Sequence, residues 1–279
     1  MKKVIVLLLA AVLLLSVIGC KKAESKKLTV AMSPDFAPME FVDTSKSGQE
    51  QYVGFDVTLA NFLAKELGME LEIKPMSFDA CMTAVQLGSV DMAISGFSWK
   101  PDRAENFLLS DYYIAGDNET QQSVITVKAK ENTCKTQADF SGWKVGAQAS
   151  SLQEQLVKDE LIPAGAELVV YKSIDDAVLA LQTGKIDALA VAHGNGEAII
   201  ANNPDLAFTG FDFDVDPKYE NNVILLNKSN TEMLEKVNKV LAKAMAAGVY
   251  DGWYEDAKAL AGIPTAADVS YDDDGKPIQ

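Results

Sequence analysis

The most constraining feature of the sequence is a helix-to-strand connection that begins at Ala84 and Val85. This apolar helical turn is followed by Gly88, which suits the left-handed conformation that ends many helices. The apolar run 90–94 is then long enough only for a strand that is buried on both faces. A helix, a glycine stop and a buried strand in this order predict an α/β fold.

Small polar residues follow this strand, and a new helix begins after them. Ser95, Gly96 and Ser98 lie where the strand ends, which is where open α/β sheets bind ligands. Pro101 suits the first position of the next helix and places Arg103 in its first turn. A cation there opposes the helix dipole at a cost of about 0.3–1 kcal/mol, which favours a bound anion as the reason for Arg103. A surface ion pair with a neighbouring acidic residue is the alternative.

The same pattern occurs a second time in the chain. Residues 84–94 read AVQLGSVDMAI, and residues 180–190 read ALQTGKIDALA. Any helix-to-strand connection obeys similar rules, but the repeat supports two lobes of similar design. The order of strands and helices predicts mainly parallel, helix-covered sheets. The expected strands are 28–32, 69–73, 90–94, 123–127, 143–147, 167–171, 187–191 and 223–226, and the expected helices are 56–67, 78–87, 151–160, 173–183, 231–247 and 250–261.

The first 19 residues are predicted to be a signal peptide. Two lysines precede the apolar run 4–17, which is too short for a membrane-spanning helix. The sequence VIGC that ends at Cys20 resembles a bacterial lipobox, which implies cleavage before Cys20 and a lipid on its thiol. Residues 20–27 would then be a tether. The expected location is the extracytoplasmic face of the bacterial cell membrane, reached through the lipid alone, and an ordinary signal peptide is the alternative.

Composition excludes several classes of function. The sequence has 40 Asp and Glu residues against 25 Lys and Arg, a net charge of −15 that argues against nucleic acid as a partner. His193 is the single histidine, which argues against a His-rich metal site. No P-loop or nucleophile elbow occurs, and we expect no cofactor. Cys81 and Cys134 are predicted to be unpaired thiols, with a disulfide between them as the alternative.

Four spaced motifs carry a resemblance to a known family. They are GSVD at 88–91, SGFS at 95–98, KPDR at 100–103 and SDYY at 110–113. The chain resembles, over nearly its whole mature length, the polar amino-acid-binding proteins of ABC importers. The resemblance implies a two-lobed type II periplasmic-binding-protein (Venus-flytrap) fold with two hinge crossings, near 115–122 and 211–220, that closes around a ligand. Lobe 1 would comprise 28–115 and 217–265 and lobe 2 residues 116–216, followed by an acidic tail at 266–279.

The resemblance also implies which residues bind the ligand. Arg103 would clamp its α-carboxylate, helped by the loop after the strand. Phe36 and Phe55 would sandwich its side chain, with core packing as the alternative. Ser150 and Ser151 replace the Gly-Thr that is common in the family, where N–H groups of the second lobe meet the carboxylate. The complete expected set is Asp35, Phe36, Phe55, Ser95, Gly96, Ser98, Arg103, Gln148, Ser151, Leu152 and His193.

Two departures concern the amine of the ligand. The family usually has an Asp at the position of Ala192, where it holds the α-ammonium, and another at the position of Ser33. Three candidates remain for the amine: the Asp35 carboxylate, which is our first choice, the backbone carbonyls around 95–96, or a ligand whose amine is absent or displaced.

The predicted function is therefore that of a monomeric solute-binding lipoprotein. It would capture a polar amino acid or a close relative and deliver it to the permease and ATPase subunits of an ABC transporter, without catalysis. The alternative is an enzyme on the same fold, dehydratase-like, that acts on a small carboxylate. Such an enzyme needs a general acid or base, for which Asp35, His193 and Glu197 are the candidates.

Overall fold

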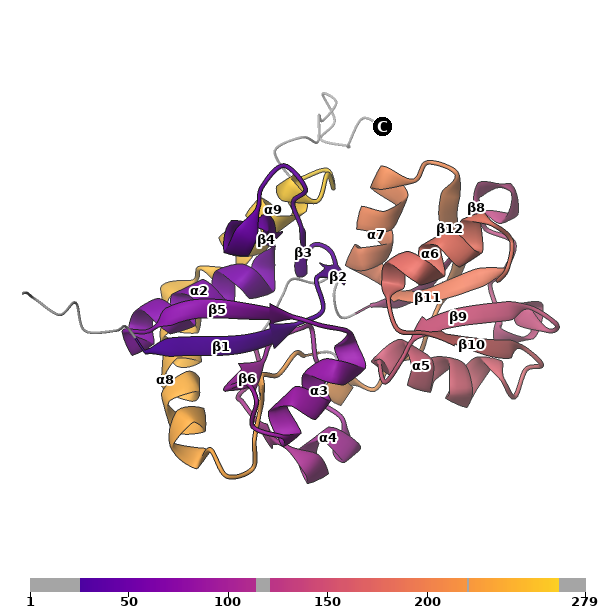
Figure 1. The fold of residues 1–279 in the computed structure, drawn as a ribbon. Helices are drawn as coiled ribbons and strands as arrows, with labels where there is room; N and C mark the ends of the chain where they lie inside the picture. The colour runs from indigo at the N-terminus through magenta and orange to yellow at the C-terminus, as the bar shows by residue number, and fades with distance from the viewer. Residues whose placement is uncertain (1–25, 114–120, 220, 266–279) are drawn as a thin grey trace, which may run out of the picture.

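Two α/β lobes make up the computed structural model, which describes residues 26–113, 121–219 and 221–265 (Figure 1). Each lobe is built on a five-stranded sheet with apolar clusters on both faces. This arrangement confirms the α/β, two-lobed fold class. The signal peptide with Cys20, most of the first hinge crossing and the acidic tail lie outside the described residues.

The sheet of lobe 1 has the strand order β5-β1-β6-β13-β7. The first three strands are parallel, and β13 pairs antiparallel with both of its neighbours. Helices α2, α8 and α9 cover one face, and α3 covers the other. The bounds are β1 Lys27–Met32, β5 Glu70–Pro75, β6 Met92–Ala93, β7 Leu108–Leu109, β13 Leu225–Leu226, α2 Phe55–Leu67, α3 Phe78–Gln86, α4 Pro101–Asn106, α8 Thr231–Ala247 and α9 Tyr250–Leu260.

The sheet of lobe 2 has the order β10-β9-β11-β8-β12. Strands β10, β9 and β11 are parallel, whereas β8 is antiparallel to β11 and β12. Helix α5 continues as a π-helical turn, Val157–Leu161, on one face, and α6 and α7 cover the other. The bounds are β8 Gln122–Val127, β9 Lys144–Gln148, β10 Glu167–Tyr171, β11 Ala188–Ala192, β12 Leu206–Asp212, α5 Leu152–Leu156, α6 Ile174–Gln182 and α7 His193–Asn202.

Helix α7 and strand β12 were not predicted from the sequence. Two glycines near the start of α7 favour a loop locally. One of them, Gly196, is required by packing, because a Cβ there would lie 2.7 Å from the ring of Phe208 in β12. Close packing of α7 on β12 therefore decides the conformation of this segment.

A small antiparallel sheet, β2-β3-β4, lies where the two lobes meet (Figure 1). Its strands are Asp35–Phe36, Glu40–Val42 and Tyr52–Val53. Side chains here reach across to lobe 2: Asp35 Oδ2 accepts a hydrogen bond from Ile174 N at 2.8 Å, and Asn195 Nδ2 donates to Ala37 O at 2.8 Å. The structure is therefore a closed arrangement of the lobes. Short 3₁₀ turns occupy Gly48–Gln51, Lys128–Lys130, Gln137–Phe140 and Pro217–Tyr219.

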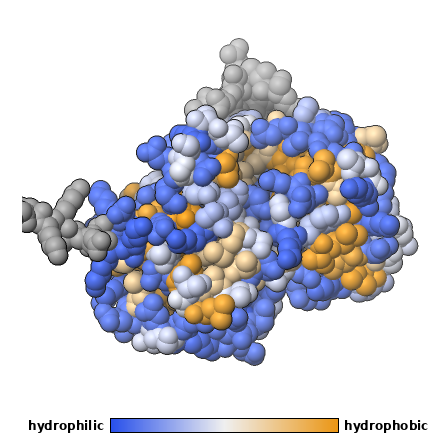
Figure 2. Space-filling view, in the orientation of Figure 1, coloured by the Kyte–Doolittle hydropathy of each residue, from blue (hydrophilic) through white to orange (hydrophobic). Residues whose placement is uncertain are grey.

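Hydrophilic residues cover most of the face shown in Figure 2, and an apolar patch lies over β10, an edge strand that leaves Val170 about half exposed. Within the described ranges, no helix combines the length and the apolar character that a membrane crossing needs.

Cys81 and Cys134 are buried free thiols, which confirms the prediction that they do not pair.

Two buried carboxyl groups fix the loop that follows β6. Ser95 Oγ donates a short hydrogen bond to Glu40 Oε1, and Gly96 N donates to Asp56 Oδ2 at 2.8 Å. Tyr113 also donates to Asp56 Oδ2, at 3.0 Å. Glu40 and Asp56 are fully buried, so the loop is held from behind by groups that water does not reach.

Burial raises the pKa of both carboxyl groups. The pKa of Glu40 lies well above its ordinary value, first through desolvation and then through the charge of Asp56. Desolvation raises the pKa of Asp56 to about 7, although hydrogen bonds from Gly96, Tyr113 and Glu40 oppose this. The two outer oxygens, Glu40 Oε2 and Asp56 Oδ1, have no other partner. The raised pKa values favour the protonated forms of these two buried carboxyl groups.

This pair predicts a pH-dependent stability. The unfolded chain releases these protons near pH 4, whereas folded Asp56 holds its proton up to about pH 7. The stabilisation is therefore fully present below pH 4 and is lost as the pH rises to about 7. The stability of wild type relative to the double variant Glu40→Gln/Asp56→Asn, measured by urea unfolding, is expected to fall across this range.

The comparison with the double variant cancels the other titrating groups, which both proteins share. Parallel stability curves for the two proteins between pH 4 and pH 7 would contradict a raised pKa at this pair.

Candidate ligand-binding site

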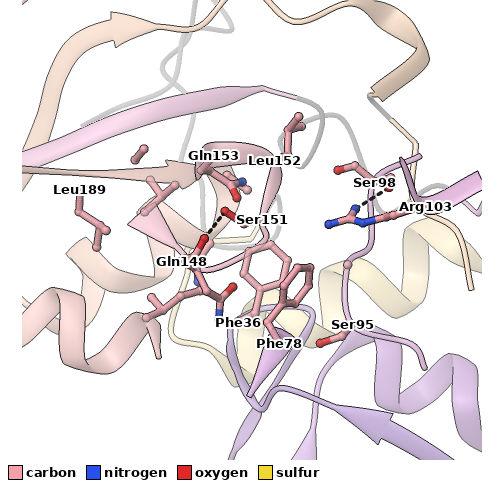
Figure 3. Close-up of a pocket in the computed structure, with 16 residues that line it drawn as sticks. Phe36, Phe78, Ser95, Ser98, Arg103, Gln148, Ser151, Leu152, Gln153 and Leu189 are labelled. Atoms are coloured by element: carbon pink, nitrogen blue, oxygen red, sulfur yellow. Dashed lines mark hydrogen bonds between the residues drawn. The ribbon is translucent and has the colours of Figure 1, made fainter. Parts of the chain in front are cut away.

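A cavity lies between the lobes, at the carboxyl ends of β6, β9 and β11 (Figure 3). This is the edge at which parallel α/β sheets bind ligands. Its empty space is about 490 Å³, including the part that is open to solvent. Its walls are Phe36, Phe78, Ser95, Gly96, Ser98, Arg103, Gln148, Ser151, Leu152, Gln153, Ile174, Leu189, Ala190, Val191, Ala192 and Asn195.

Most of the residues expected from the sequence meet in this one cavity. Those that line it are Phe36, Ser95, Gly96, Ser98, Arg103, Gln148, Ser151 and Leu152. The structure brings them together from both lobes, since the first five belong to lobe 1 and the last three lie at or just after the end of β9 in lobe 2. Asp35, Phe55 and His193 do not line it.

Arg103 is almost completely buried at 1% exposure, so its interpretation as a surface residue is wrong. Its Nη1 donates to Ser98 O at 2.6 Å, and its Nη2 donates across the lobes to Ser150 O at 3.0 Å. Its Nε has no partner. Desolvation lowers the pKa of Arg103 to about 10, so the guanidinium remains charged at neutral pH. A buried cation bound only by carbonyl oxygens is ready to receive an anion.

The backbone around Arg103 is adapted to this position. Ser150, whose carbonyl accepts from Arg103, has a φ of 64°. This left-handed conformation suits glycine, which the resemblance places there, and a serine adopts it only when the surroundings impose it. Ser151 then begins α5, where its Oγ accepts from Glu154 N at 3.0 Å.

Aromatic rings form one wall, but they are not the predicted pair. Phe36 and Phe78 both line the cavity, and Figure 3 draws their rings between Gln148 and Ser95. Gly96 allows this packing, because a Cβ there would lie 2.6 Å from the Phe36 ring.

Phe55 is a correction to the sequence prediction. Its ring is fully buried in the core of lobe 1, where it contacts Tyr113, Tyr250, Trp253 and Tyr254 with centroid distances of 5.9–6.3 Å. As the first residue of α2 it faces α9 rather than the ligand cavity. The alternative of core packing is the correct one.

His193 is a second correction. It begins α7, and its ring stacks on Phe208 at 4.5 Å while its Nδ1 lies 2.8 Å from Ser123 Oγ. The ring therefore faces β8 and β12. Two residues further along the same helical turn, Asn195 lines the cavity instead.

Asp35 is a third correction. Its carboxylate accepts hydrogen bonds from Ser33 Oγ and from Ile174 N, both at 2.8 Å. Because it caps the start of α6 from the opposite lobe, it joins the lobes and is absent from the cavity wall. Our first choice for holding the ligand amine therefore does not fit the structure.

Sequence reasoning missed Phe78, Gln153, Ile174, Asn195 and the β11 residues that line the cavity. Phe78 and Ile174 are the first residues of helices that follow strands. Because ligands bind where such strands end, their positions in the sequence could have predicted a place in the cavity wall. Asn195 had no such signal, because the helix that carries it was not expected. In the described part of the chain, no cluster of three or more metal-ligating side chains occurs.

Comparisons with known proteins agree with this geometry. The family model for bacterial extracellular solute-binding proteins, family 3, matches residues 28–256. The chain is 30% identical over 247 residues to the arginine-binding extracellular protein ArtP of Bacillus subtilis, covering 86% of this chain and 92% of that protein. It is 27% identical over 271 residues to a probable histidine-binding protein of Campylobacter jejuni, covering 90% and 96%.

Solved structures show the same similarity. AbpA of Streptococcus pneumoniae, an amino acid ABC transporter substrate-binding protein bound to L-arginine, matches with a TM-score of 0.77 and 35% identity, over 85% of this chain and 97% of that chain. These relatives are binding proteins of transport systems and not enzymes, so the enzyme alternative is set aside. The motifs, the two-lobed fold and the match over most of its length show that the chain belongs to the bacterial extracellular solute-binding proteins, family 3.

Proposed function

We propose that this protein is a lipid-anchored receptor that captures a polar amino acid or a close relative. It hands the ligand to the permease of an ABC transporter, which an ATPase drives. Arg103 binds the carboxylate of the ligand, and closure of lobe 2 (116–216) on lobe 1 (28–115 and 217–265) traps it. The lipid on Cys20 holds a monomeric receptor at the extracytoplasmic face of the membrane.

One observation carries the proposal: the Arg103 guanidinium is 1% exposed in the interlobe cavity, and its polar contacts are with carbonyl oxygens. A buried charge without a counter-ion is costly, and a ligand carboxylate removes this cost. Because Ser150 of lobe 2 shares the same guanidinium, binding and closure are coupled. A ligand that contacts both lobes stabilises the closed state through its higher affinity for it.

The relatives support the ligand class. Among them are arginine-binding and histidine-binding proteins, and one is solved with L-arginine bound. An α-carboxylate is common to these ligands, and Arg103 accounts for it.

The enzyme alternative lacks a chemical group in the right place. A general acid or base must reach the substrate directly or through one water. Asp35, His193 and Glu197 were its candidates, and none of them lines the cavity.

Arg103→Ala is expected to weaken binding of the carboxylate ligand by about tenfold to 150-fold. This range corresponds to about 1.5–3 kcal/mol for a lost charge-assisted hydrogen bond. Isothermal titration with the ligand that most raises the melting temperature of wild type measures it.

Lys100→Ala is the matched control, because it removes a cation one turn away that does not line the cavity. It is expected to bind as wild type does. An Arg103→Ala protein that is folded and binds within threefold of wild type would show that the carboxylate is held elsewhere.

Cys20→Ala is expected to move the protein from the membrane fraction to the soluble fraction, because the lipid is the proposed anchor. Immunoblots of fractionated cells measure the distribution. Cys134→Ala is the control and should stay with the membrane. A Cys20→Ala protein that still needs detergent for release would contradict the lipid anchor.

A further inference from the structure

As far as the described residues form it, the wall of the interlobe cavity carries one positive charge and no negative charge. Among the described residues that line it, Arg103 is the only ionisable side chain. Three acidic side chains of lobe 1 near the cavity have other roles: Asp35 joins the lobes, while Glu40 and Asp56 are fully buried behind the loop that follows β6. Within the described ranges, a ligand in this cavity therefore meets a cation at one point and neutral groups elsewhere.

Three buried polar atoms of the wall have no partner in the protein. They are Arg103 Nε, Gln148 Nε2 and Asn195 Oδ1, on residues that are 1%, 8% and 2% exposed. The first two are donors, so they require acceptors such as a carboxylate or a carbonyl. Asn195 Oδ1 is an acceptor and requires a donor. Unpaired buried polar atoms of this kind indicate where the polar groups of a ligand bind.

The orientation of the Asn195 amide is fixed by the opposite lobe. Its Nδ2 donates to Ala37 O at 2.8 Å, so the oxygen is the atom left without a partner. This bond forms between the lobes, and so the acceptor is presented in the closed arrangement.

A neutral oxygen selects a neutral donor. An ammonium group that leaves water must be compensated by an opposite charge, and an amide oxygen supplies none. The rings of Phe36 and Phe78 can attract a cation but carry no net charge to neutralise it, and Arg103 already lies 5.5 Å from the centroid of the Phe78 ring. A hydroxyl or an amide N–H, by contrast, is fully satisfied by one oxygen acceptor.

We propose that this cavity selects a small carboxylate whose second polar group is an uncharged hydrogen-bond donor, and that Asn195 Oδ1 accepts from this donor. The inference rests on the proposed function, since it assumes a carboxylate at Arg103. It narrows the ligand class to close relatives of amino acids that lack the charged amine, such as 2-hydroxy acids. Asn195 is then a specificity-determining residue.

The test compares matched pairs of ligands that differ only at this group. L-Arginine, L-histidine and L-phenylalanine are each paired with the 2-hydroxy acid of the same side chain and configuration, and both are titrated calorimetrically into the ligand-free mature chain carrying Cys20→Ala. The hydroxyl and the ammonium are similar in size, so shape is controlled. In every pair that binds, the 2-hydroxy acid is expected to bind at least tenfold more tightly.

Two variants place a carboxylate in the wall and are expected to reverse this preference. Asn195→Asp changes the acceptor itself. Ala192→Asp keeps the hydrogen bond of Asn195 to Ala37 and adds the charge at another wall residue. It therefore tests the effect of a carboxylate on the preference even if Asn195→Asp does not fold. Asn203→Asp is the control, because it adds the same charge just after α7 and outside the cavity wall. It should leave the preference unchanged.

The outcomes separate the two proposals. A wild-type protein that binds the amino acid as tightly as, or more tightly than, its hydroxy partner would overturn this inference and leave the proposed function standing. A preference that neither carboxylate variant shifts would overturn the role of Asn195. If no member of any pair binds, the proposed function fails and the inference fails with it.

Discussion

A buried cation, Arg103, lies between the two lobes of the closed structure. Arg103 reaches into the space between the lobes, where Ser98 of its own lobe and Ser150 of the other lobe share its guanidinium. Carbonyl oxygens satisfy part of its hydrogen-bonding capacity but do not neutralise its charge. An anion would neutralise this charge. Residues of both lobes line the cavity around Arg103. The proposed function attributes both binding and closure to this same charge.

The rest of lobe 1 keeps this site rigid. The buried pair Glu40 and Asp56 holds the loop at Ser95 and Gly96, and it does so by hydrogen bonds that are isolated from water. Gly96 in turn makes room for the Phe36 ring. Asp35 of lobe 1 accepts from Ile174 N, and Asn195 of lobe 2 donates to Ala37 O, so both residues join the lobes beside the cavity. A preorganised wall of this kind reduces the entropy lost on binding.

The sequence predicted the parts of this site that follow local rules. Gly88 and the run 90–94 indicated a strand end, and the loop and Arg103 after it line the cavity as expected. What it could not predict depends on tertiary packing. Phe55 opens a helix as expected, but only the position of α9 shows that its ring faces the core. Likewise the glycines before Glu197 suggested a loop, and only the packing of α7 on β12 places Asn195 in the wall and His193 outside it.

The central claim, that a carboxylate held by Arg103 closes the two lobes, is tested most directly by a crystal structure of the mature protein with its tightest small carboxylate ligand. The account predicts that the carboxylate oxygens lie within hydrogen-bonding distance of Arg103, including Nε, with the ligand between the Phe36 ring and the residues of lobe 2. A ligand whose carboxylate points away from Arg103, or that binds outside the interlobe cavity, would contradict it.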